Sequence, residues 1–242
     1  MRGGSFSIIP PSAILVRYVL FQQTTSTMRT IAIFTLLIFY CGLVFGQENT
    51  VQKSNHVKFS PLRMIDLVNP GFEIGFEKNY GKNLSSQISV GLMSDPFKLT
   101  QFTNYKGFRF SFEEKFFKNL SGNKRDYYSI EPVYLRVNYF DEGQFIKDTA
   151  LNTPEYWDTF KVSKQTFSLN LKYGMQFYFN RFVIDASIGL GIKYKAVNRS
   201  EMIDENAYQV GPRHPNAYYE ASRAGNYIRP NVPMNIKIGY SF

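Results

Sequence analysis

The chain has 242 residues, of which 17% are aromatic and only 19% are charged, and its mean hydropathy is −0.25. This composition excludes an acidic disordered chain and a charge-rich coiled coil, and the length allows one domain or two small ones. Lys and Arg number 28 against 19 Asp and Glu, but the net charge of +9 is spread along the chain, so we predict no nucleic-acid partner. A single cysteine, Cys41, allows no intrachain disulfide.

A leader is predicted ahead of the main domain. Residues 28–46 open with Met28 and Arg29 and continue as an apolar run. Val44 and Gly46 then stand at positions −3 and −1 of a cleavage site before Gln47. This is the layout of a secretory signal peptide. The run is short for a membrane helix, which needs about 20 residues. We therefore expect residues 1–27 to be an upstream extension from a mis-assigned start, 28–46 the signal peptide and 47–55 a periplasmic linker.

Beyond residue 55 the hydrophobicity alternates with a period of two, which indicates β-strands. The clearest runs, 167–179, 182–194 and 232–242, hold this alternation for 11 to 13 residues, as long as a tilted membrane strand requires. Five further segments alternate less regularly: 56–66, 71–79, 85–93, 107–117 and 127–140. Eight strands predict an all-β, antiparallel, up-and-down transmembrane β-barrel over residues 56–242.

From the second strand on, the connections between the predicted strands alternate in length; the first connection, around Asn69-Pro70-Gly71, departs from this pattern because it is short for an outer loop. Short turns and longer loops follow one another: 79–83, 94–106, 118–126, 141–163, 180–181 and 197–229. Outer-membrane barrels have short periplasmic turns and long outer loops, so we place both ends of the barrel on the periplasmic side.

Aromatic residues gather near the short turns, as expected of an interfacial girdle. They are Tyr80, Phe116, Phe117, Tyr127, Tyr128, Phe177, Phe179, Phe182, Tyr240 and Phe242.

Alternation alone leaves open which face of the barrel meets lipid. The polar face carries glycines, which suit the narrow interior of an eight-stranded barrel, and charges of both signs that are expected to pair across the lumen. The predicted lumen charges are Glu73, Glu77, Arg109, Glu113, Arg136, Lys172, Asp185 and Lys193. In segment 127–140 this assignment turns Val133, Leu135, Val137 and Tyr139 toward lipid.

The end of the sequence carries a family resemblance. Asn235-Ile236-Lys237-Ile238-Gly239-Tyr240-Ser241-Phe242 resembles the C-terminal strand of bacterial outer-membrane barrels, in which alternating apolar residues and a terminal aromatic are read by the barrel-assembly machinery. Tyr240 and Phe242 occupy the signal positions. With the pattern over 56–242, the chain resembles small eight-stranded barrels of the OmpA/OmpX type, in the style of Bacteroidetes proteins. The resemblance implies an outer-membrane monomer surrounded by lipid, without a wide pore.

Motifs for catalysis or cofactors are nearly absent. The sequence has no GxSxG, HExxH, Walker or GxGxxG motif, and its two histidines lack metal-ligand spacing, so we predict no enzyme, metal or cofactor. One alternative remains, because lipid A palmitoyltransferases use His, Asp and Ser near the outer rim. His214 with Asp204 and Ser200 or Ser222 would imitate that set, although the N-terminal amphipathic helix of that family is missing.

The two longest loops hold the candidate contact residues, because Tyr, Trp and Arg dominate binding hot spots. The candidates are Tyr156, Trp157, Tyr208, Arg213, Tyr218 and Tyr219. We predict a structural or surface-interaction role, with an extracellular protein or glycan as partner. Two alternatives stay open: loops that only fold over the barrel mouth, and a secreted or periplasmic soluble barrel that binds an apolar ligand with Phe and Ile facing inward.

Overall fold

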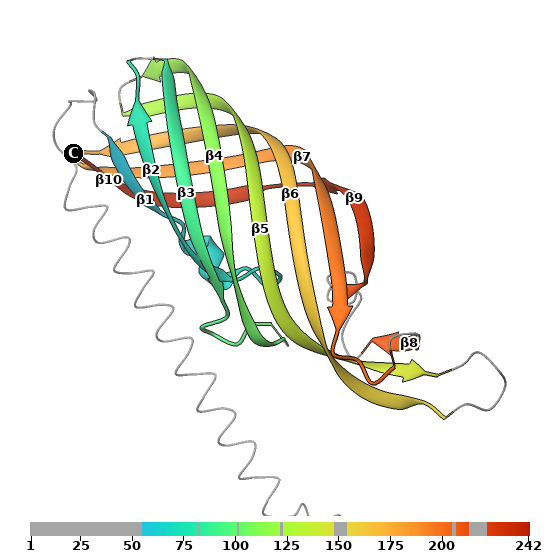
Figure 1. The fold of residues 1–242 in the computed structure, drawn as a ribbon. Coiled ribbons are helices and arrows are strands. Elements are labelled where there is room, and N and C mark those ends of the chain that lie inside the picture. The colour runs from blue at the N-terminus through green and yellow to red at the C-terminus, as the bar shows by residue number, and fades with distance from the viewer. Residues whose placement is uncertain are drawn as a thin grey trace, which may run out of the picture. The chain divides into compact units, whose positions relative to one another are not determined.

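The computed structural model describes residues 55–81, 83–100, 102–121, 123–147, 154–204, 207–212 and 222–242. The predicted upstream segment 1–27, the predicted signal peptide 28–46 and all but the last residue of the predicted linker 47–55 lie outside these ranges. The described residues form a closed antiparallel β-barrel (Figure 1). The all-β, eight-stranded up-and-down architecture is thereby confirmed.

The barrel is built from long strands joined in chain order. The strands are β1 (His56–Phe59), β2 (Gly71–Asn79), β3 (Leu84–Ser94), β4 (Thr103–Ser121), β5 (Lys124–Ile146), β6 (Tyr156–Phe179), β7 (Phe182–Ser200), β8 (Tyr208–Pro212), β9 (Gly225–Asn231) and β10 (Met234–Ser241). β9 and β10 both pair with β7, one after the other, so together they make the eighth strand of the barrel. β10 also pairs with β1 and closes the barrel.

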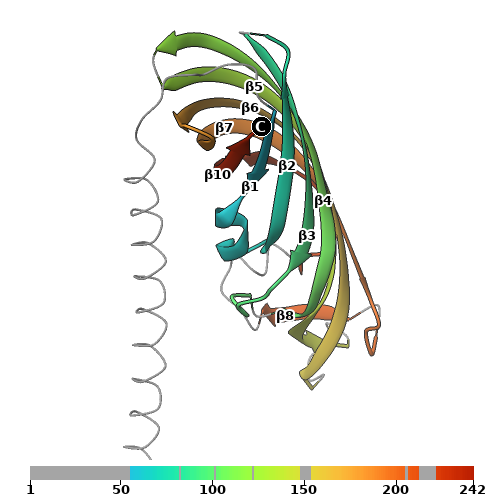
Figure 2. The same ribbon diagram turned by 90° about the vertical axis from the view of Figure 1, so that its left-hand side faces the viewer.

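The first strand is much shorter than predicted. β1 ends at Phe59, and Pro61 begins a 3-10 helix, η1 (Pro61–Ile65), because proline has no N–H to continue the ladder and suits the first helical turn. η1 lies against β2 and β10, on the concave side of the sheet (Figure 2). Among the described residues, β9 pairs with β7 alone, so beyond η1 no ladder joins β9 to β2. No helix in the described ranges is long and apolar enough to cross a membrane.

The long connections are shorter than predicted because the strands run further. β5 and β6 stay paired up to Phe145 and Tyr156, well past the ends of their neighbours, and β8 adds to β5 over residues 143–146 (Figure 1). We call residues 143–146 of β5, 156–158 of β6 and β8 the extension. The expected loop 141–163 is therefore mostly strand. The predicted two-residue turn 180–181 is present, with Asn180 in the left-handed region at φ 55°.

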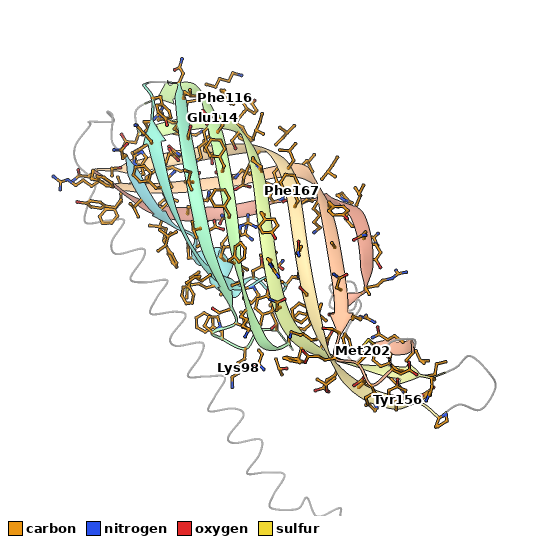
Figure 3. All side chains as sticks on the ribbon, in the orientation of Figure 1. Lys98, Glu114, Phe116, Tyr156, Phe167 and Met202 are labelled. Atoms are coloured by element: carbon orange, nitrogen blue, oxygen red, sulfur yellow. The ribbon has the colours of Figure 1, made fainter. Side chains whose placement is uncertain are left out.

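Large apolar side chains point out of the barrel and charged ones point in. Leu92, Leu171 and Leu190 are 68%, 63% and 70% exposed, whereas Lys58 and Glu77 are fully enclosed. Phe116, near the short-turn rim, and Phe167, on the middle of the wall, also lie on the outer surface (Figure 3). The alternative of a soluble barrel, with Phe and Ile facing inward around an apolar ligand, is therefore wrong for the strands that carry these outward apolar side chains.

For β5, the prediction of which side chains face the interior is wrong. Val133, Leu135, Val137 and Tyr139 of β5 point inward and are almost completely buried, while Arg136 is exposed on the outer surface and is not a lumen charge. The reason is an apolar plug that fills the barrel near the long connections, so the inward face of β5 is apolar there, whereas Arg136 and Asn138 lie on its outward face. The plug consists of Met93, Phe102, Tyr105, Leu135, Val137, Tyr139, Phe145, Phe160, Val162 and Val197.

Two members of the expected girdle also point inward. Phe117 and Tyr127 are 7% and 1% exposed, in edge-to-face contact with each other, because they share the alternation parity of the interior.

Candidate functional site inside the barrel

The interior near the short turns is filled by a compact charge cluster. Lys58 Nζ lies 2.6 Å from Glu77 Oε2 and 2.5 Å from Asp185 Oδ2, and Lys115 Nζ lies 2.6 Å from each of the same two atoms. All four side chains are buried, and their formal charges cancel. Tyr127 Oη donates to Asp185 Oδ1 at 2.5 Å, which satisfies the remaining carboxylate oxygen.

A second balanced layer lies beside the first. Glu113 contacts Lys172 at 2.7 Å and Lys237 at 3.1 Å, and Lys172 also contacts Glu131 at 3.2 Å. Asn170 donates its amide to Glu131 at 3.1 Å. We call the two layers together the charged floor; it comprises Lys58, Glu77, Glu113, Lys115, Glu131, Lys172, Asp185 and Lys237.

Most of the predicted lumen charges meet in or beside this floor. Glu77, Glu113, Lys172 and Asp185 belong to it, and Glu73 pairs with Arg109 at 2.8 Å and with Arg63 at 3.5 Å. Lys193 faces the interior but lies apart from the floor.

Three cations of the floor escaped sequence reasoning. Lys115 and Lys237 carry the same parity as the polar faces of their strands, so parity was a sufficient signal for both. Lys58 lies in an alternation that Pro61 cuts short after five residues, His56 to Ser60, so its parity signal is weaker.

A cavity of about 750 Å³ separates the charged floor from the apolar plug. The strand register explains its walls: Lys164, Thr166 and Ser168 of β6 stand opposite Val197, Lys195 and Lys193 of β7, and the next strand places Gly225, Tyr227 and Arg229 beside these. Since residues two apart share a face, these side chains converge on one interior surface.

The cavity is strongly basic. Among the described residues that line it, one is acidic, Asp66, and six are basic: Arg63, Arg109, Lys164, Lys193, Lys195 and Arg229. We call this space the basic cavity.

The turn after η1 forms one side of the basic cavity. Asp66 Oδ1 accepts hydrogen bonds from the backbone N–H groups of Val68 and Asn69, and its other oxygen lies 3.3 Å from Arg63. Lys164 Nζ donates to Asn69 Oδ1 at 2.9 Å and so connects this turn to β6 on the opposite wall. The acidic side chain at the cavity is thus used to build the turn.

The predicted loop contacts are dispersed. Trp157 is 57% exposed on the extension, and Tyr156 packs against Phe145 with ring centroids 6.2 Å apart. Tyr208 lies in β8, where its backbone pairs with Ile146. Arg213, Tyr218 and Tyr219 lie outside the described residues.

The predicted assembly signal lies at the closure of the barrel. Tyr240 accepts a hydrogen bond from Arg181 at 3.1 Å and packs edge-to-face on Phe182, and the ring of Phe242 lies 6.4 Å from that of Phe76.

The enzyme alternative is not assembled by the described residues. His214 lies outside them, Ser200 is exposed at the end of β7, and Ser222 is buried with its hydroxyl 3.2 Å from that of Tyr139. In the described part of the chain, no three His, Cys, Asp or Glu side chains are grouped to hold a metal ion.

Comparison with known proteins identifies no family for this chain. No protein-family model and no curated protein matches the chain. A similar solved structure is that of a major outer membrane protein from Thermus thermophilus, with 11% identity, a TM-score of 0.37, and coverage of 78% of this chain and 98% of that one. A match with this score carries no functional argument.

Proposed function

We propose that the protein is an integral bacterial outer-membrane β-barrel with a closed interior, and that its extension is a contact surface outside the cell. The observation that carries this proposal is the apolar band around the barrel. Its exposed members lie on strands β2 to β7 and on β10. They are Phe72, Ile74, Ile88, Val90, Leu92, Phe108, Phe110, Ile130, Phe167, Leu169, Leu171, Ile188, Leu190, Ile192, Met234 and Ile236.

In water such a band would be a severe liability, because soluble proteins rarely expose apolar patches larger than a few hundred Å². In lipid it is the expected exterior, and a closed barrel satisfies its backbone hydrogen bonds internally. Exposed aromatics at the short-turn end support an interfacial girdle there. They are Tyr80, Phe116, Tyr128, Phe182, Tyr240 and Phe242.

The short turns belong on the periplasmic side in this proposal, with export by the predicted leader. Tyr240 and Phe242 on β10 remain the proposed signal for the barrel-assembly machinery. The extension then projects outward with Trp157 and Val210 exposed at 57% and 51%, and Ile203, between β7 and β8, is 74% exposed. Exposed Trp beside aliphatic side chains suits a protein or glycan partner. We propose no enzymatic activity.

The proposal can be tested with the single Trp of the chain. In vesicles, acrylamide in the aqueous phase should quench Trp157 fluorescence, and brominated acyl chains should not. The matched control is Phe167→Trp in a Trp157→Phe background, whose fluorescence brominated chains should quench. If acrylamide quenched both proteins equally and brominated chains quenched neither, a lipid-facing band would be ruled out.

Sidedness needs a second measurement. With Cys41 replaced by Ser, Trp157→Cys should react with a membrane-impermeant maleimide on intact cells, and Asn180→Cys should react only after the outer membrane is opened. The reverse pattern would place the extension in the periplasm. Residence in the membrane is checked by retention after a carbonate wash and by a mobility shift on boiling in SDS.

A further inference from the structure

We propose that the basic cavity binds a phosphorylated ligand, with the phosphate held by Lys164 and Lys193. The proposal goes beyond the structural and contact role, and the binding of a phosphate group by these two lysines does not require that role to be correct. Its starting point is the difference between two interior regions of one barrel: every lysine of the charged floor has a carboxylate partner, whereas Lys164 and Lys193 of the basic cavity have none among the described residues.

In the charged floor every lysine has a carboxylate within about 3 Å. In the basic cavity, Lys164 is 3% exposed, and its ammonium contacts the neutral amide of Asn69. Lys193 forms no ion pair with any described residue. Its direct neighbour in the ladder is Arg229, and like charges opposite each other destabilise a sheet. A bound anion would supply the counter-charge that these two lysines lack among the described residues.

The carboxylates nearest to Lys164 and Lys193 are paired with arginines. Arg63 and Arg109 share Glu73, and Arg63 also contacts Asp66. Two carboxylates, Glu73 and Asp66, therefore serve these two guanidinium groups, and neither forms an ion pair with Lys164 or Lys193. Ammonium groups bind phosphate as point charges.

Size and lining also fit a phosphorylated molecule. A volume of about 750 Å³ lies within the usual range of small-molecule pockets, about 300–1,000 Å³. Neutral polar side chains lie beside the cations and suit hydroxyl groups: Asn69, Thr166, Ser168, Asn170 and Asn231. A phosphorylated sugar combines these two kinds of group.

The cavity also reaches the outer surface of the barrel. Val232 and Met234 line it and are 63% and 64% exposed, at the break between β9 and β10 where η1 replaces a continued first strand. The same phosphate chemistry therefore has two sources: a soluble phosphorylated sugar, or a lipid headgroup that enters from the side. The second source rests on the proposed membrane location.

The test uses the full barrel in non-ionic detergent, with a boiling-shift gel to show that each variant is folded. Glucose 6-phosphate is titrated by calorimetry, with glucose as the uncharged comparison; phosphatidic acid is added in mixed micelles, with phosphatidylcholine as its comparison. The cavity variant is Lys164→Gln/Lys193→Gln. The matched control, Lys106→Gln/Arg136→Gln, removes two charges that are exposed on the outer surface.

We expect the cavity variant to bind at least one of the phosphate ligands about tenfold or more weakly than the wild type, since it loses the two ammonium groups that would donate charge-assisted hydrogen bonds to the phosphate. The control should bind as the wild type does. Loss confined to glucose 6-phosphate identifies a soluble ligand, and loss confined to phosphatidic acid identifies a lipid headgroup. Equal affinities of the cavity variant and the control for both ligands would overturn the proposal.

A second readout separates binding from a structural role. Without ligand, the cavity variant should unfold at a higher urea concentration than the wild type, because it loses repulsion between like charges. Glucose 6-phosphate or phosphatidic acid should raise the wild-type midpoint and leave that of the variant unchanged. A variant that is less stable than the wild type in the absence of ligand would show that the lysines serve the fold, against the proposal.

Discussion

At the scale of single residues, the interior charges are held by mutual contacts that leave little freedom. Lys115 contacts Glu77 and Asp185 at 2.6 Å each and Gln87 Oε1 at 3.0 Å, and it lies 4.8 Å from the ring centre of Tyr127. The desolvation cost of burying such charges is large, so their pairing matters most when one partner is removed.

Replacing Lys115 by Met should therefore destabilise the barrel by about 3–5 kcal/mol, because Glu77 and Asp185 would be left with one buried cation between them. The control is Lys124→Met, which removes a lysine that is 42% exposed and paired with Asp126 at 3.2 Å. A surface pair of this kind contributes about 0–1 kcal/mol. Urea unfolding in lipid vesicles measures both, and equal losses would show that the floor is not a buried network.

Gly174 illustrates a requirement for close approach. A Cβ at this position would overlap the Cζ and Oη atoms of Tyr127. Gly174→Ala should displace the tyrosine from Asp185 and cost about 1–3 kcal/mol, the usual range for overpacking.

The second substitution Tyr127→Leu frees the space around position 174. We expect Gly174→Ala to cost markedly less in the Tyr127→Leu background than in the wild type, as a double-mutant cycle of unfolding free energies would show. Additive losses would mean that the two residues do not clash.

At the scale of elements, β6 passes through interior regions of different chemistry, and its outer face is apolar from Phe167 to Tyr173. Near the short turns its inward residues join the charged floor, and toward the extension Phe160 and Val162 enter the apolar plug with no exposed surface. Phe167, on the same strand, is 53% exposed on the outer wall.

This pair of phenylalanines offers a comparison of the two faces. Phe160→Ala should leave a cavity in the plug and cost about 3–5 kcal/mol. Phe167→Ala should lose transfer energy alone, about 1.5–3 kcal/mol at most, because lipid fills the vacated space. Unfolding of both variants in the same vesicles gives the order, and a larger loss at Phe167 would contradict the assignment of faces.

At the scale of the whole molecule, the described residues stack three layers inside one barrel: charged floor, basic cavity and apolar plug. An eight-stranded barrel encloses a space that side chains alone can fill. Fully buried Lys58, Gln87, Lys115, Tyr127 and Gln176 occupy it near the short turns.

The protein should therefore show no large, stable conductance in planar bilayers. The Lys164→Gln/Lys193→Gln variant should be equally silent, because it leaves the floor and the plug intact. Reproducible single-channel openings of wild-type protein, absent from a mock purification, would contradict a closed interior.

Much of this architecture follows from alternation in the sequence. A period of two holds wherever one face meets the outer surface and the other meets polar groups, so 71–79 was predicted with the observed bounds of β2 and 182 as the observed start of β7. Pro61 likewise marked the weak point of the first strand, because a residue without an N–H cannot continue a ladder.

Other features depend on neighbours that are distant in the chain. The inward turn of Val137 and the outward position of Arg136 follow from the apolar plug, to which β3, β4, β6 and β7 also contribute. The long pairing of β5 with β6 was not predicted, because the residues that extend it lie in a segment, 141–163, that is rich in charged residues. The basic cavity exists because β6, β7 and β9 are in register beside a turn more than 90 residues earlier in the sequence, and alternation within a single strand carries no information about such register.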